Sequence, residues 1–119
     1  MTVRRDWSDA RQKIEAEGRC RVCLRGDKKL DAAHIIGRRY DRPRVEGSTT
    51  KILWVNPLSV FAACRDCHFE YDAHRLSILK HLTVEEQIQA VKDAGGIELA
   101  RRRIDPLDYR PEIEEARRS

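Results

Sequence analysis

Apolar residues along this chain fall into short blocks separated by charged and turn-forming residues, and the blocks predict the elements of the fold. The runs at residues 30–36 and 58–63 are short and largely apolar, which favours two buried strands that pair with each other. Residues 64–76 follow the second run and predict a short helix. Residues 37–51, between the strands, are rich in Gly, Pro, Ser and Thr, so they predict a long loop. A loop of this length in a small domain is usually functional.

Three further segments carry the start and stop signals of helices. Residues 8–17 begin with a serine that can act as N-cap and end before a glycine. Thr83 and Glu86 have the spacing of a capping box ahead of residues 84–94, which end at two glycines. Residues 97–104 predict another short helix. The order helix, strand, loop, strand, helix, with helical additions at both ends, predicts an α+β fold.

Length and composition suggest one domain with a thin core. The chain has 119 residues, of which 37% are charged and 6% aromatic. We expect the domain to span residues 1–110, with its core at about 18–76 and a helical C-terminal extension at 83–104, and residues 111–119 to fray. No apolar run follows the basic amino-terminal residues, and no apolar stretch reaches about 18 residues. We therefore expect no secretory signal, no membrane span and a cytoplasmic location.

The cysteines carry the strongest chemical signal in the sequence. All four fall in two C-x-x-C pairs, Cys20 with Cys23 and Cys64 with Cys67. This spacing lets a tight turn direct both thiolates of a pair at one ion, and zinc takes four such ligands in a tetrahedron. We expect one structural Zn²⁺ that closes a loop of about forty residues. With four thiolates the ion has no open position for chemistry.

Positive charge is concentrated between the two cysteine pairs. The net charge of the chain is +4, and residues 19–51 alone hold ten Lys or Arg against four Asp or Glu. Such a cluster is typical of proteins that bind polyanions, although a solvated loop has the same composition. The candidate nucleic-acid-binding residues are Arg38, Arg39, Arg42 and Arg44.

The histidines and one asparagine stand in register with the cysteines. The segments are C-R-V-C at 20–23, A-H-I-I at 33–36, Asn56, and C-R-D-C-H at 64–68. This arrangement resembles the HNH endonuclease family, and the chain as a whole most resembles the small free-standing HNH proteins of tailed phages. The resemblance implies a ββα-metal core, in which a hairpin and one helix hold a divalent ion, stapled here by zinc and flanked by helices.

The resemblance also implies roles for individual residues. His34 would be the general base that activates water, since a neutral imidazole accepts a proton near pH 7. Asn56 would order the loop between the strands through backbone hydrogen bonds. His68 would bind the catalytic ion, which would stabilise charge on the phosphate and the leaving oxygen. Asp72 lies one helical turn beyond His68, and this pair suits Mg²⁺, Mn²⁺ or Zn²⁺.

One position departs from the family pattern. Many HNH proteins carry a metal ligand directly before the catalytic histidine, and Ala33 here cannot coordinate. Asp31, Asp72 or His74 can fill the gap, or water can. Alternatively, His34 binds the metal and another group activates water. A third alternative is a site with weak catalysis.

The sequence thus predicts a metal-dependent DNA endonuclease or nickase. A single small domain presents one site, so we expect a monomer or weak dimer that nicks one strand. The resemblance to phage proteins implies work beside the DNA-packaging machinery, with the terminase large subunit as a candidate partner. The alternatives are a zinc-stabilised DNA-binding module without activity and a partner-docking module that uses the C-terminal helices.

Overall fold

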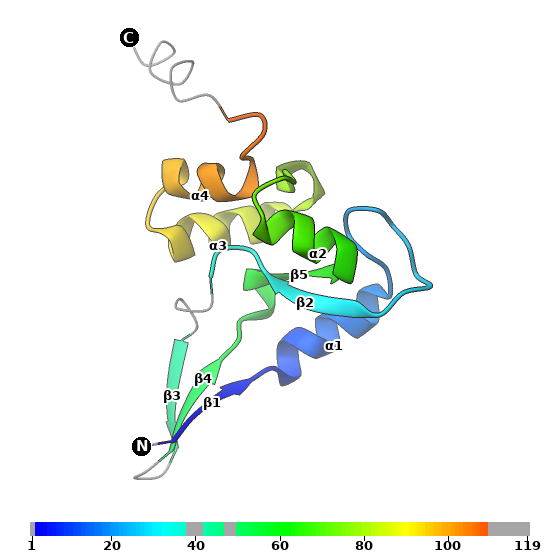
Figure 1. Cartoon of the computed structure of the whole chain (residues 1–119). Helices are drawn as coiled ribbons and strands as arrows, with labels where there is room; N and C mark the ends of the chain where they lie inside the picture. Colours follow the sequence, from blue (N-terminus) through cyan, green and yellow to red (C-terminus); the bar gives the residue numbers. More distant parts are fainter. Residues whose placement is uncertain (1, 38–41, 47–49, 110–119) are drawn as a thin grey trace.

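The computed structural model describes the backbone of residues 2–37, 42–46 and 50–109, and the side chains of residues 3–37 and 52–109. Within these residues the chain has an α+β fold with four α-helices and two small sheets, which confirms the predicted class (Figure 1). None of the described helices has both the length and the apolar character needed to cross a bilayer.

A β-hairpin followed by a helix lies at the centre of the molecule. β2 (Leu30–His34) and β5 (Val60–Cys64) pair antiparallel, as predicted, with Leu30 opposite Cys64. β5 is buried along its whole length because both faces of the hairpin are covered. α2 (Arg65–Asp72) starts directly after β5 and ends four residues earlier than predicted.

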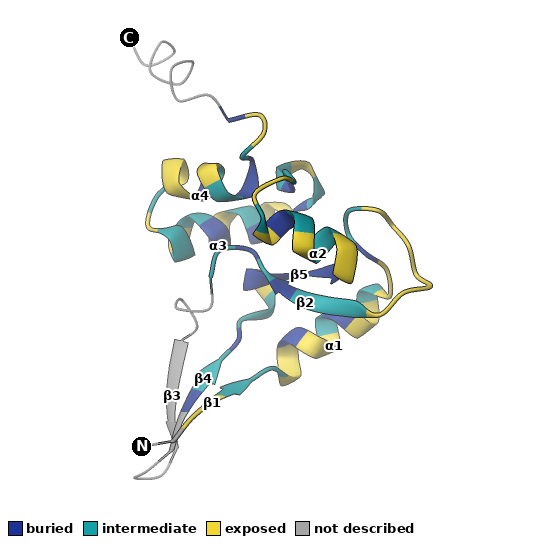
Figure 2. Cartoon of the chain, viewed as in Figure 1, coloured by how far each residue is buried: buried dark blue, intermediate teal, exposed yellow. Residues whose placement is uncertain are grey.

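Helices cover the two faces of this hairpin (Figure 2). On one face, α1 (Ser8–Glu17) packs Ala10 and Ile14 against β5. On the other face, Ala33, Phe61 and Tyr71 form a second cluster with α3 (Val84–Ala94) and α4 (Ile97–Ile104). Successive strand residues point to opposite faces, so neighbouring apolar residues of β5 fill both clusters.

The predicted loop at residues 37–51 is wrong in part. β3 (Arg42–Glu46) and β4 (Thr50–Trp54) pair antiparallel, and β1 (Thr2–Asp6) pairs parallel with β4. The three strands form an arm that extends away from the helices (Figure 1). The Gly, Pro, Ser and Thr content of this segment predicts turns. β3 and β4 are extended because they pair with each other, and β4 also pairs with the distant β1.

The helix boundaries follow local signals, with one correction. The N-cap of α1 is Trp7 and not Ser8. The carboxylate of Asp6 accepts hydrogen bonds from the Ser8 backbone N–H, at 3.0 Å, and from the Ser8 hydroxyl, at 2.6 Å. Gly18 ends the helix in the left-handed region with φ 67°, as its lack of a Cβ allows. The tail at residues 111–119 lies outside the described residues.

The predicted capping box at the start of α3 is confirmed. The Thr83 hydroxyl accepts from the Glu86 N–H at 3.1 Å, and the Glu86 carboxylate accepts from the Thr83 N–H at 2.7 Å.

We expect Thr83→Ala to lower the free energy of unfolding by about 1 kcal/mol, and Thr83→Ser to lower it by only a small part of that amount, because serine keeps the hydroxyl. Urea denaturation measures both values. Equal stability of the alanine variant and the wild type would show that the cap contributes nothing.

Candidate metal centre and adjoining cavity

The four cysteine thiols converge at one point of the fold. One sulfur from each of Cys20, Cys23, Cys64 and Cys67 lies within 4.8 Å of every other. The Sγ atoms of Cys23 and Cys64 are 3.8 Å apart. A tetrahedron with zinc–sulfur bonds of about 2.3 Å has edges of about 3.8 Å, so the spacing fits the ion. The cluster could therefore hold a structural metal ion such as zinc.

Backbone hydrogen bonds hold the two cysteine pairs in place. The Leu24 N–H donates to the Cys20 carbonyl at 2.9 Å and closes the first turn, while the Arg21 N–H donates to Ala62 of β5 at 2.8 Å. Burial raises the pKa of Cys20, but the backbone N–H groups of Cys23 and Cys64 outweigh that effect and bring it to about 7. Burial raises the pKa of Cys67 in the same cluster, so the thiols differ in how readily they ionise without a metal. The cluster joins the turn to the β5–α2 junction.

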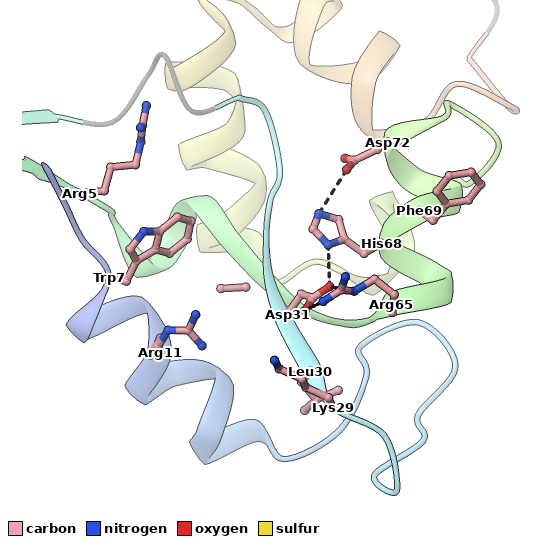
Figure 3. A pocket seen from close by; sticks show the side chains of 11 residues that line it. Arg5, Trp7, Arg11, Lys29, Leu30, Asp31, Arg65, His68, Phe69 and Asp72 are labelled. Carbon is pink, nitrogen blue, oxygen red and sulfur yellow. Dashed lines mark hydrogen bonds and ion pairs between the residues drawn. The ribbon is translucent and has the colours of Figure 1, made fainter. Parts of the chain in front are cut away.

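An open cavity of about 680 Å³ lies around the edge of β2 (Figure 3). Its lining includes Arg65 and His68, which directly follow Cys64 and Cys67 in the chain. Side chains of α2 and Asp31 of β2 form one side of it. Residues of the amino-terminal segment form the other side, with Lys29 and Leu30 at the start of β2. The cavity lining includes four cationic residues, Arg5, Arg11, Lys29 and Arg65.

His68 lies between two carboxylates on the α2 side of the cavity. Its Nδ1 is 2.9 Å from an oxygen of Asp31, and its Nε2 is 3.3 Å from an oxygen of Asp72 (Figure 3). Burial alone raises the pKa of Asp31, but the hydrogen bond from His68 and the charge of Arg65 outweigh it and lower that pKa. The Arg65 Nε is 3.1 Å from the Asp31 carboxylate. The structure therefore places the predicted metal ligands His68 and Asp72 next to Asp31.

His34 lies on the other side of β2. Ala33 is fully buried in the cluster beneath α2, so the strand alternation turns His34 toward α1. There its ring meets the Trp7 ring edge to face, with centroids 5.3 Å apart. Trp7 lines the cavity and His34 does not. The structure thus separates the predicted base from His68 and leaves Trp7 between His34 and the cavity.

Two other predicted residues lie outside the cavity. The Asn56 carboxamide oxygen accepts from the Leu58 N–H at 2.9 Å and caps the 3₁₀ turn Pro57–Ser59, so Asn56 orders the segment that leads into β5. His74 is exposed just beyond α2 in a left-handed conformation, with φ 61°, and does not line the cavity.

Within the described part of the chain, the cysteines form the only group of three or more metal-ligating side chains that lie within 4.8 Å of one another. His68 and Asp72 offer two ligands. One is an imidazole nitrogen, which suits Zn²⁺ better than the hard Mg²⁺, and the other is a carboxylate oxygen, which suits either ion.

The cationic residues that line the cavity are not the nucleic-acid-binding residues that the sequence predicts. Arg38 and Arg39 lie outside the described residues, and the backbone of Arg42 and Arg44 belongs to β3. Arg5, Arg11 and Lys29 were not among the predicted residues. Lys29 belongs to the basic segment 19–51, whereas Arg5 and Arg11 lie before it in the chain. Only folding brings them to one cavity.

Three comparisons with known proteins identify no relative of this chain. No protein-family model matches the chain, and neither the curated proteins nor the solved structures show a significant similarity.

Proposed function

We propose that this protein is a metal-dependent DNA endonuclease or nickase of the HNH type, in which His68 and Asp72 bind the catalytic divalent ion. The observation that supports the proposal is their position. They lie one turn apart on the helix that follows a β-hairpin, at the wall of an open cavity lined by four cationic residues. The antiparallel pair β2 and β5 leads directly into α2, and two cysteines precede it while two lie at the β5–α2 junction; β3 and β4 are inserted between the paired strands. This arrangement agrees with the ββα core that the sequence resemblance implies.

Asp31 sets the tautomer and the orientation of the His68 ring in the proposed site. A carboxylate that accepts from the Nδ1–H of a histidine fixes the tautomer and directs the Nε2 lone pair away from itself. In this protein Nε2 points toward Asp72, so one imidazole nitrogen and one carboxylate face the same point. A divalent ion bound there would act as a Lewis acid on a phosphodiester. Asp31 is thus a positioning residue rather than a replacement for the ligand that Ala33 lacks.

The cationic side chains account for the second requirement, which is the binding of the DNA backbone. Phosphate contacts by Arg and Lys supply most of the affinity for DNA and position the strand without reading its sequence. Arg65 is held by Asp31 next to His68, while Arg11 and Lys29 line the cavity farther along β2. A strand that crosses the cavity would therefore meet the charge of Arg65 beside His68 and the charges of Arg11 and Lys29 nearer α1.

A nicking assay tests the proposal. Supercoiled plasmid is incubated with the protein and Mg²⁺, Mn²⁺ or Zn²⁺, and the open-circular product is measured with and without each added metal. We expect His68→Ala and Asp72→Asn each to reduce the nicking rate at least tenfold, because each removes a ligand. Asp31→Asn should raise the metal concentration needed for half-maximal rate. His74→Asn is the matched control, since Asn tolerates the left-handed conformation and His74 lies outside the cavity.

The second candidate function, a DNA-binding module without activity, is favoured by one observation. Ala33 is fully buried, so nothing at the position before His34 reaches the cavity. If plasmid stays equally intact with the wild type and with His68→Ala in every metal, while both proteins bind DNA, the nuclease proposal fails and the module remains. His34→Ala is informative in the same assay, because a full-rate variant would rule out His34 as the base.

A further inference from the structure

The side of the cavity that lies across β2 from His68 comes from the amino-terminal segment. Arg5 stands at the end of β1, Trp7 caps α1, and Arg11 is one turn further along that helix. Figure 3 shows the Trp7 ring between these two arginines, with the β2 strand separating it from His68. Neither the zinc centre nor the His68–Asp72 pair uses these three residues.

The positive charges on the amino-terminal side of the cavity suit the binding of phosphate. Arg11 is exposed on α1, and Lys29 is exposed at the start of β2. No ion pair joins either of them to a carboxylate of the described residues, in contrast to Arg65, which contacts Asp31. Both carboxylates of the cavity lie on the α2 side. The cavity is thus divided into a side with His68 and two carboxylates and a side with cations and one indole.

The position of Trp7 adds a flat aromatic surface to these cations. The indole is half-buried, packs against the apolar cluster beneath α1, and meets the His34 ring at an interplanar angle of 79°. These contacts hold the ring at the cavity wall, so little side-chain freedom is lost when a ligand stacks on it. An aromatic ring beside cations is the usual arrangement for binding unpaired nucleotides, because every base has a π-face and every linkage a charge.

We propose that Arg5, Trp7 and Arg11 form a subsite for an unpaired nucleotide, with the base stacked on Trp7 and the adjacent phosphates held by the arginines and Lys29. This inference rests on the proposed function, since it names the strand that the same cavity takes. The bases of a duplex are stacked inside it and cannot reach the indole. The cavity therefore prefers a single strand, a gap or a branch to intact duplex.

Fluorescence of one tryptophan tests the stacking directly. The chain has only two tryptophans, so Trp54→Phe leaves Trp7 as the single reporter, and Trp7→Phe leaves Trp54 on β4. Both proteins are titrated at low salt, without added divalent metal, with a thymidine oligonucleotide of about eight residues and with a G·C-rich DNA hairpin, whose intramolecular pairing keeps it double-stranded at that salt. We expect the single strand to quench Trp7, the hairpin to quench it far less, and neither to quench Trp54 as strongly.

Affinity measurements test the charges. By anisotropy of a labelled thymidine oligonucleotide, we expect Arg11→Gln to weaken binding about threefold and to reduce the salt dependence by about 0.7 in log–log slope, as for one lost phosphate contact on a single strand. Arg102→Gln is the control, an exposed helix arginine on α4 outside the cavity. Trp7→Leu should weaken binding about tenfold, and its folding is checked by circular dichroism.

The outcomes separate this inference from the nuclease proposal. Binding in these titrations needs no catalytic ion, so quenching of Trp7 by the single strand supports the subsite even if the plasmid is never nicked. The subsite is overturned if the single strand leaves Trp7 unquenched, if the hairpin quenches it equally, or if Arg11→Gln and Arg102→Gln bind alike. Nicking that depends on His68 would stand in any of these cases.

Discussion

Removal of the metal from the cysteine cluster is expected to unfold the protein. Structural zinc contributes on the order of 10 kcal/mol of apparent folding free energy in small domains, which is as large as the whole stability of most of them. Here the cluster joins the turn at Cys20 to the start of α2, and Cys20 and Cys64 are 0% and 2% exposed. Without the ion, the four thiols lose the ligand that links the two pairs, and only backbone hydrogen bonds still connect the first turn to β5.

Metal analysis and circular dichroism test this expectation. Protein purified without chelators should contain one zinc per chain, and the sulfur ligands should give thiolate-to-metal absorption when cobalt replaces zinc. Excess chelator should abolish the cooperative thermal transition, and added zinc should restore it. Cys64→Ser should behave as the chelated protein does. A chain that stays folded with less than one zinc would contradict the assignment and would remove the frame that positions His68.

Replacement of Glu86 should give the second largest loss of stability. Glu86 is 1% exposed, and its carboxylate accepts from Lys13 Nζ at 2.5 Å and from Arg21 Nη1 at 2.6 Å. These contacts join α3 to α1 and to the turn of the first cysteine pair. Removing one member of a buried ion pair leaves the other charges uncompensated, which costs about 3–5 kcal/mol. We expect Glu86→Gln to lose stability in this range near neutral pH.

The loss should depend on pH in a defined direction. Burial raises the pKa of Glu86, but hydrogen bonds from Arg21 and Lys13 outweigh it and lower the pKa from 4.5 to about 2. A carboxyl with a depressed pKa in the folded state contributes stability above its unfolded pKa and loses it as the pH falls toward the folded one. The contribution is therefore complete above about pH 5 and should vanish between pH 4.5 and 2.

Urea denaturation of three proteins measures this effect. Glu85→Gln is the matched control, because Glu85 is the exposed neighbour in the same helical turn. Acid also protonates the cysteines and weakens metal binding, so the quantity to follow is the difference between wild type and Glu86→Gln at each pH where both still unfold cooperatively. That difference should shrink as the pH falls below 4.5. A constant difference, or an equal loss in Glu85→Gln, would show that the ion pairs contribute no stability.

Local signals predicted a large part of the structure. Each C-x-x-C pair brings its own two thiols together through one turn, and the structure brings the two pairs to one point, as a shared four-cysteine site requires. The capping box at Thr83 fixed the start of α3 because all its atoms lie within one helical turn. The short apolar runs predicted the pairing of β2 with β5, since each run is too short for a helix. The segment between them, predicted as one loop, contains β3 and β4.

Pairings between distant residues could not be predicted. The sequence gives no sign that residues 2–6 lie beside residues 50–54, because a strand finds its partner only when the surrounding elements are packed. The same applies to the cavity, where Asp31 meets His68 across 37 residues and the side chains of Arg5, Trp7 and Arg11 reach the same space. Sequence spacing acts over a few residues, through turns and helix periodicity. The partners of a charge or a ring are set by the tertiary packing, which alone decided that His34 faces Trp7 and that His68 faces two carboxylates.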